Sequence, residues 1–152
     1  MTGLWKSLMA GLVLSVLAAL ASHPAKAGDF IPYTKERLQA LQADPAKPIL
    51  VFVNANWCPI CAKERPIVAR LIGANAGGKK YDGDPDLVGM DCVYIDFDVQ
   101  RDAWRSFGVT EQSTLIVFRG GTEVGRAVGM TNADDIKALL MKATDKAAVA
   151  KG

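Results

Sequence analysis

The spacing of hydrophobic positions changes several times along the chain, and each change predicts where one element ends and the next begins. The run "PILVFVNA", residues 48–55, is continuously apolar and rich in β-branched side chains, which indicates a strand buried on both faces. From Cys58 onward the period becomes helical, with Cys61, Val68 and Ile72 on one face. This order of strand and helix places Cys58 at the N-terminus of the predicted helix.

The rest of the chain shows the same two spacings. The other predicted elements are a helix over 34–43, a strand over 92–98, a helix over 99–107, strands over 113–119 and 123–129, and a helix from Thr131 or Asn132 to about Ala143. The last two strands form a predicted hairpin around Gly120 and Gly121. Strands separated by helices, then a hairpin and a closing helix, predict an α/β fold with a sheet of mixed strand directions.

Residues 73–89 are expected to form a loop, because they hold five glycines and few apolar side chains. The alternating aspartates of its "DGDPD" stretch resemble the opening of a calcium-binding loop. Leu87, however, stands where such a loop needs glycine, and Val93 stands where it needs a bidentate glutamate. The sequence therefore favours a solvated acidic loop over a calcium site.

The first 27 residues have the features of a secretory signal peptide. Lys6 precedes an apolar run from Leu8 to Ala21, and Ala25-Lys26-Ala27 matches an A-x-A cleavage site. The apolar run is shorter than the ~20 residues that span a bilayer, which favours a cleaved signal peptide over the alternative, a retained anchor. We therefore expect a signal peptide over 1–27, export across the inner membrane to the periplasm, a mature domain over 28–143 and a flexible tail over 144–152.

Composition and charge narrow the class of protein. Half of the residues are hydrophobic, and a mature chain of about 125 residues is long enough for one domain with one core. Cleavage would remove Lys6 and Lys26 but no acidic residue, so the net charge of +2 becomes zero. The mature chain therefore lacks the basic excess expected of a nucleic-acid-binding protein.

Cysteine carries the candidate chemistry. Cleavage would remove His23, the only histidine, and leave three cysteines. A c-type haem needs histidine directly after the second cysteine of a C-x-x-C pair, and that residue here is Ala62. A tetrahedral zinc site needs four Cys or His ligands, one more than remains. The pair Cys58 and Cys61 in "NANWCPICAKERP" is therefore better explained as a redox couple.

A thiolate attacks disulfides far better than a thiol does. Unpaired backbone N–H groups and the dipole at a helix N-terminus favour negative charge, so the pKa of Cys58 should fall and Cys58 should be the nucleophile. Cys61, one turn further on, can resolve the mixed disulfide, while Pro59 holds the turn and Trp57 covers the pair with an apolar surface. The alternative is a structural disulfide, which the short loop disfavours because closing it stabilises little.

From about Pro48 to Leu140 the chain resembles the thioredoxin family. The resemblance rests on "WCPIC" with Pro66 after the second cysteine, "DFD", "FGV" ahead of "STLIVFRGG", and "VGM" before the last helix. It implies a thioredoxin-like fold, a central mixed β-sheet flanked by helices, with Cys58 and Cys61 as catalytic residues and the redox-active disulfide in place of a cofactor. The substrate-binding residues that follow from it are Trp57, Pro59, Gln112, Ser113 and Thr114.

Two positions depart from the family pattern. Phe52 stands where thioredoxins place a buried aspartate that assists proton transfer at the resolving thiol. Glu64 could replace that aspartate through water, but a solvated glutamate on an exposed helix face is the favoured interpretation. Ser113 stands where the family has a cis-proline, so we expect a trans peptide bond between Gln112 and Ser113. The space that this change opens beside Cys58 could admit a metal or cluster.

The resemblance favours a reductase of exported proteins. Oxidases of the DsbA type carry a histidine between the cysteines and a large helical insertion, whereas this chain has Ile60 and only the loop over 73–89. Electrons would come from a membrane thiol transporter of the DsbD or CcdA kind. Two alternatives stay open, a non-enzymatic iron–sulfur or metal-binding module and a redox carrier dedicated to one partner. Cys92 is expected to be a buried inert thiol, with an intermolecular bridge or a third redox site as alternatives.

Overall fold

The structure is a computed structural model that describes residues 30–144. The signal peptide predicted over 1–27 and nearly all of the tail predicted over 144–152 lie outside the described residues. Within residues 30–144, none of the helices combines the length and the apolar character that a bilayer crossing requires.

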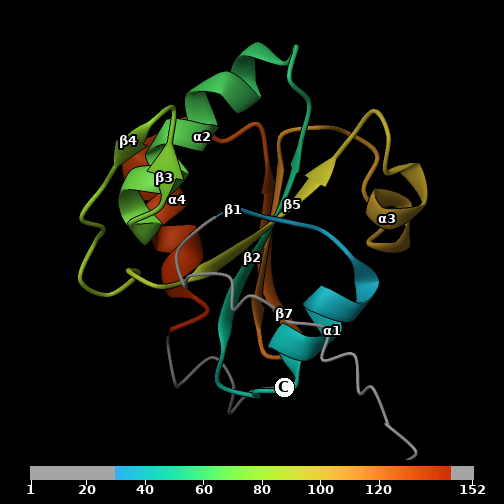
Figure 1. The fold of residues 1–152 in the computed structure, drawn as a ribbon, viewed down its shortest axis with the longest axis horizontal. Helices are drawn as coiled ribbons and strands as arrows, with labels where there is room; N and C mark the ends of the chain where they lie inside the picture. Colours follow the sequence, from blue (N-terminus) through green and yellow to red (C-terminus); the bar gives the residue numbers. More distant parts are fainter. Residues whose placement is uncertain (1–29, 145–152) are drawn as a thin grey trace, which may run out of the picture.

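A five-stranded sheet forms the centre of the molecule (Figure 1). Its strands follow the order β1-β5-β2-β6-β7. Its strands are β1 (Phe30–Pro32), β2 (Pro48–Asn54), β5 (Asp91–Asp96), β6 (Thr114–Arg119) and β7 (Thr122–Val128). The strands β1, β5 and β2 run parallel, while β6 is antiparallel to both β2 and β7. The predicted mixed sheet is therefore confirmed.

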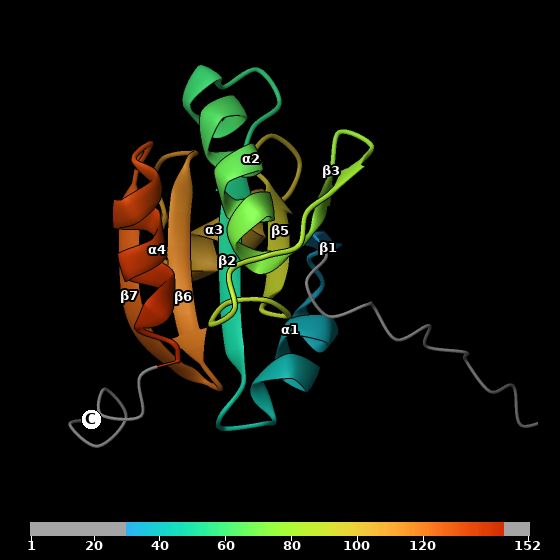
Figure 2. The same ribbon diagram turned by 90° about the vertical axis from the view of Figure 1, so that its left-hand side faces the viewer.

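Two helices cover each face of the sheet. The helices α2 (Pro59–Ile72) and α4 (Ala133–Met141) lie side by side on one face, as Figure 2 shows, and α1 (Lys35–Gln42) and α3 (Arg101–Ser106) lie on the other. Each pair packs on its own apolar cluster. The predicted thioredoxin-like arrangement, a mixed sheet flanked by helices, is thus what the chain adopts.

The central strand β2 explains the continuous apolar run in the sequence. Leu50 and Phe52 point into the cluster under α2 and α4, while Ile49, Val51 and Val53 point into the cluster under α1 and α3. All five side chains are fully buried. Because both faces of the strand are covered, no polar side chain interrupts it, and the strand ends where Asn54 leads into the loop before Cys58.

Three short strands differ from the prediction. The strand β1 was not predicted, because three residues are too few to show a period; its pairing with β5 defines it, beginning at Phe30 opposite Cys92. The prediction of a plain loop over 73–89 is wrong in part. It contains a small hairpin, β3 (Asn75–Ala76) and β4 (Lys79–Lys80), whose turn residues Gly77 and Gly78 both have positive φ.

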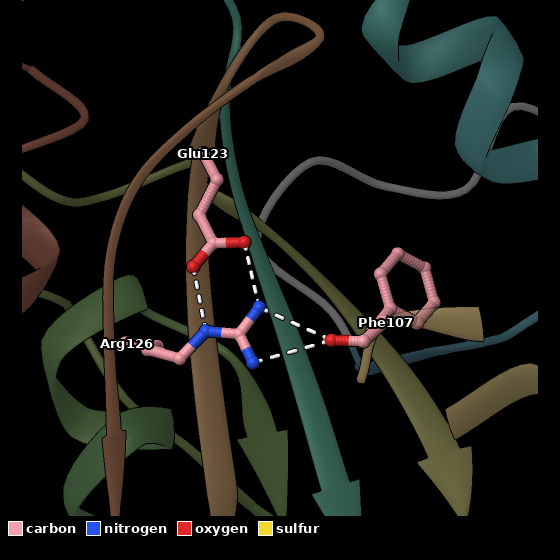
Figure 3. A network of polar contacts seen from close by, with 3 residues as sticks. All are labelled: Phe107, Glu123 and Arg126. Carbon is pink, nitrogen blue, oxygen red and sulfur yellow. Dashed lines mark hydrogen bonds and ion pairs between the residues drawn. The ribbon is translucent and has the colours of Figure 1, made fainter. Parts of the chain in front are cut away.

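The segment 107–113 carries part of the candidate site and is held at its start by Arg126 of β7. The Arg126 guanidinium donates to both carboxylate oxygens of Glu123, at 2.6 and 2.7 Å, and to the Phe107 carbonyl at 3.2 Å (Figure 3). At its other end, the Gly129 N–H donates to the Ser113 carbonyl at 2.8 Å. The edge strand β7 and Gly129, the residue directly after it, therefore hold the two ends of this segment.

Candidate functional site

Cys58 is the N-cap residue of α2, as the sequence predicts. Its backbone is extended (φ −78°, ψ 116°), Pro59 occupies the first turn, and the Cys61 N–H donates to the Cys58 sulfur at 3.2 Å. Proline suits the first turn of a helix because the N–H that it lacks has no partner there, and its fixed φ is already helical. The sulfur therefore takes the place of the side-chain oxygen that usually caps a helix.

The two thiols of this pair have opposite electrostatic environments. Burial by itself raises the pKa of Cys58, but hydrogen bonds from the Cys61 side chain and backbone outweigh it. The backbone N–H of Ile60 and the Gln112 side chain add to them, and together they hold the pKa of Cys58 below its ordinary value of 9.0. Burial and the nearby Cys58 sulfur raise the pKa of Cys61 to about 11. Cys58 is thus the sulfur that ionises first.

Four exposed apolar side chains lie at the end of the sheet where Cys58 is found. Trp57, Ile60, Val99 and Val128 are 62%, 40%, 78% and 54% exposed, and we call these four residues the apolar rim. They lie at the same end of the sheet. Trp57 and Ile60 follow the carboxyl end of β2, and Val99 follows that of β5. Val128 is the last residue of β7 and pairs with the first residue of β6.

Trp57 has a fixed place in this rim. Its indole N–H donates to both carboxylate oxygens of Asp98, at 3.1 and 3.0 Å, in the loop after β5. Cys58 itself is only 2% exposed, and the half-buried Gln112 side chain lies against it. Little of the Cys58 sulfur is therefore open to solvent while Gln112 lies against it.

Ser113 lies on the inner side of the pair. The described residues contain no cis peptide bond, which confirms the trans bond predicted between Gln112 and Ser113. Ser113 has a positive φ of 61°, a conformation that non-glycine residues seldom adopt. Thr114, the next residue, is buried, and its hydroxyl donates to the Glu111 carbonyl at 2.7 Å.

Glu64 is where the prediction was wrong. The residue was expected on an exposed helix face, but it is fully buried. Its Oε2 accepts a hydrogen bond of 2.5 Å from the Ser113 hydroxyl, and its Oε1 has no partner. Burial raises the pKa of this carboxyl to about 7, although bonds from Ser113 and the Met130 backbone oppose the shift. The signal was present in the sequence, because Glu64 follows Cys61 by three residues and precedes Val68 by four, on the buried face.

Other candidate groups are placed away from this chemistry. Cys92 is fully buried as predicted, and burial, with the Asp91 charge beside it, raises its pKa far above the ordinary value. Asp84 of the "DGDPD" stretch pairs with Lys137 at 2.6 Å. Residues 30–144 contain no group of three or more His, Cys, Asp or Glu side chains arranged to hold a metal ion.

Comparison with known proteins identifies the family. The family model named Thioredoxin matches residues 29–142. The chain belongs to the thioredoxin family. Thioredoxin from Chlamydia muridarum is 29% identical over 62% of this chain and 80% of its own length, and thioredoxin from Alicyclobacillus acidocaldarius is 29% identical over 67% and 85%. The crystal structure of Trxlp from Edwardsiella tarda superposes with a TM-score of 0.64 at 31% identity, over 73% of this chain and 97% of that one.

The protein is therefore a thioredoxin-like redox protein with a Cys58–Cys61 pair. Of the residues predicted for the site, Trp57 and Pro59 lie beside the pair on the same segment. Gln112 and Ser113 are brought to it from a segment about fifty residues away in the sequence. Compared with the thioredoxin pattern inferred from the sequence, the site has a buried Phe52, no cis-proline, and an additional buried acid.

Proposed function

We propose that this protein is a thiol:disulfide oxidoreductase that reduces disulfides of exported proteins with its Cys58/Cys61 dithiol. The observation that carries the proposal is the unequal pair of thiols. Cys58 caps α2, accepts a hydrogen bond from the Cys61 backbone N–H at 3.2 Å and has a lowered pKa, whereas the raised pKa of Cys61 keeps that thiol protonated. A nucleophile and a resolving thiol need this division of roles.

The reaction needs no resident cofactor, because the two sulfurs carry the electron pair. The Cys58 thiolate attacks one sulfur of the substrate disulfide, forming a mixed disulfide and releasing the other substrate sulfur as a thiolate. Cys61 then loses its proton and attacks the Cys58 sulfur, so the second substrate sulfur leaves and the Cys58–Cys61 disulfide forms. In the whole reaction, the substrate gains two electrons and two protons, and the Cys58/Cys61 dithiol loses them as it becomes a disulfide.

Substrate recognition is proposed to use the apolar rim. Trp57 precedes Cys58, Ile60 lies between the two cysteines, and the indole of Trp57 is held in place by Asp98. An unfolded or extended segment with apolar side chains next to its cysteine would bury them there, at roughly 25 cal/mol per Å² of apolar surface. Gln112 gives way as the disulfide reaches Cys58, while the buried Ser113 and Thr114 hold the backbone behind Gln112.

The N-terminal segment supports the location that we propose, and the location in turn supports the proposed electron donor. Residues 1–27 have the charged, apolar and small-residue regions of a secretory signal peptide, which supports export to the periplasm. A reductase in an oxidising compartment needs electrons from elsewhere. We propose a membrane thiol transporter of the DsbD or CcdA kind as the donor that returns the Cys58–Cys61 disulfide to the dithiol.

Insulin reduction by the dithiol is the direct test. The wild-type protein with excess dithiothreitol should speed the precipitation of insulin chains, Cys58→Ser should abolish the acceleration, and the matched control Cys92→Ala should retain it. Disulfide reduction that survives Cys58→Ser contradicts the proposed mechanism. Equilibration with glutathione mixtures then sets the direction, since a potential well below that of glutathione supports reduction and one well above it supports oxidation.

A further inference from the structure

A chain of three polar groups runs inward from the resolving thiol. The Ser113 hydroxyl donates to Glu64 Oε2 at 2.5 Å, and Glu64 follows Cys61 by three residues on the buried face of α2. Burial raises the pKa of the Cys61 thiol, and the Ser113 side chain lies close enough to the Cys61 sulfur to oppose that rise. All three residues are at most 2% exposed. The surrounding residues form the apolar cluster under α2 and α4, so these groups are isolated from solvent.

The Glu64 carboxylate is not explained as a structural anion. Its Oε1 is buried without a hydrogen-bond partner, only Ser113 and the Met130 backbone oppose its raised pKa, and none of the ion pairs found within residues 30–144 includes it. The basic residues next to it on α2 do not pair with it, because Lys63 is exposed to solvent and Arg65 donates to Asn54. On the adjacent helix α4, Lys137 pairs with Asp84. A buried carboxyl in such a place costs stability and is retained most readily where it moves a proton.

The Ser113 hydroxyl has a single hydrogen, so it can donate to only one of its two neighbours at a time. The three groups can therefore be hydrogen-bonded in either of two directions. While Glu64 is ionised, Ser113 donates to the carboxylate and can accept from the Cys61 S–H. Once Glu64 holds a proton, it can donate to the Ser113 oxygen, which leaves the hydroxyl hydrogen free for the Cys61 thiolate. The same three groups are therefore hydrogen-bonded before and after a proton has passed between the ends.

We propose that Ser113, at the position where thioredoxins have cis-proline, relays the Cys61 proton to the Glu64 carboxylate when the mixed disulfide is resolved. The relay rests on the oxidoreductase function proposed above. Ser113 acts directly on the reacting thiol and is a catalytic residue, while Glu64 acts through it as the proton acceptor.

The step balances in both half-reactions. When Cys58 is in the mixed disulfide, its sulfur carries no negative charge, so burial still raises the pKa of Cys61 but the contribution of the Cys58 charge to that rise is gone. Cys61 passes its proton to Ser113, Ser113 passes its own to Glu64, and the Cys61 thiolate forms the bond to Cys58. The substrate leaves as a thiolate and takes a proton from solvent. When a donor later reduces the Cys58–Cys61 disulfide, Cys61 leaves as a thiolate and recovers the proton from Glu64 through Ser113.

Stopped-flow reaction with dithiobis(nitrobenzoate) separates the two sulfurs. Attack by Cys58 releases a first coloured thiolate, and resolution by Cys61 releases a second. Ser113→Gly removes the hydroxyl at a positive φ that glycine adopts freely, so the backbone is not strained, and Glu64→Gln removes the acid. Both variants should leave the first phase unchanged and slow the second by about tenfold or more. The matched controls Ser106→Ala and Glu36→Gln, both at exposed positions, should change neither phase.

The pH profile distinguishes a relay from a structural role. In the wild-type protein the second phase should rise with a bend near pH 7 as Glu64 ionises, and both variants should lose that bend. Their rates should approach that of the wild type at high pH, where hydroxide removes the Cys61 proton. A second phase of wild-type rate and unchanged profile in folded Ser113→Gly or Glu64→Gln overturns the relay. Absence of both phases in the wild-type protein would instead overturn the proposed function.

Discussion

Glu64→Gln offers a quantitative test of the buried acid through stability. The carboxyl has an ordinary pKa of 4.5, and burial raises it to about 7 in the folded protein. Below pH 4.5 the group is protonated whether the chain is folded or not. As the pH rises toward 7, the unfolded chain loses this proton before the folded protein does, so the free energy of unfolding must fall over this range.

The size of the fall follows from the shift. One pKa unit corresponds to about 1.36 kcal/mol, so a shift from 4.5 to about 7 destabilises the folded protein by about 3 kcal/mol above pH 7 compared with pH 4. Gln at this position does not ionise and loses the dependence. Its amide N–H groups would lie at the unpartnered Oε1 position, which adds a cost of about 1–3 kcal/mol that does not vary with pH.

Urea unfolding of both reduced proteins between pH 4 and pH 9 measures the difference. The free energy of unfolding of Glu64→Gln minus that of the wild type should increase by about 3 kcal/mol across this range, most steeply between pH 4.5 and 7. Other groups contribute equally to both proteins and cancel. Glu36→Gln should give a curve parallel to the wild type. A constant difference between wild type and Glu64→Gln would show that the carboxyl is not desolvated, and the reasoning would fail.

Three further outcomes are expected. Asp98→Ala frees the Trp57 indole, so insulin reduction should slow about fivefold through a higher KM, while the first thiolate-release phase with dithiobis(nitrobenzoate) stays unchanged. An equal loss of rate in both assays would refute a role for the apolar rim. Lys47→Met leaves the buried Asp91 carboxylate without its 2.8 Å partner and should lower the urea-unfolding free energy by about 2 kcal/mol, part of which Lys47→Met/Asp91→Asn recovers. Cys92→Ala should cost about 1 kcal/mol in the same assay and leave the redox potential unchanged, whereas a shifted potential would make Cys92 part of the couple.

The long elements were predictable because burial on both faces, or on one helical face, leaves a regular pattern. The run over 48–55 predicted β2 because both of its faces are covered. Asn132 was one of two predicted caps for the last helix, and its side chain accepts from the N–H groups of Asp134 and Asp135. The strands β1, β3 and β4 were missed because two or three residues show no period, and only their partners define them.

The candidate site was predictable along the chain but not across it. The C-x-x-C pair and its place at a helix N-terminus are local features, so Cys58 and Cys61 could be assigned from sequence. The link between Ser113 and Glu64 joins positions 49 residues apart in the chain, which no local pattern reveals. Glu64 was assigned to solvent because glutamate is seldom buried, although its spacing from Cys61 and Val68 placed it on the inner face.

The pH dependence of alkylation tests the unequal thiol pair most directly. Reduced protein is treated briefly with iodoacetamide across a range of pH, and mass spectrometry identifies the modified cysteine. We expect Cys58 to be modified with a midpoint below its ordinary pKa of 9.0, while Cys61 remains a thiol until the pH approaches about 11. Modification of Cys61 at the same pH as Cys58 or lower, or a Cys58 midpoint at or above 9.0, would contradict the account.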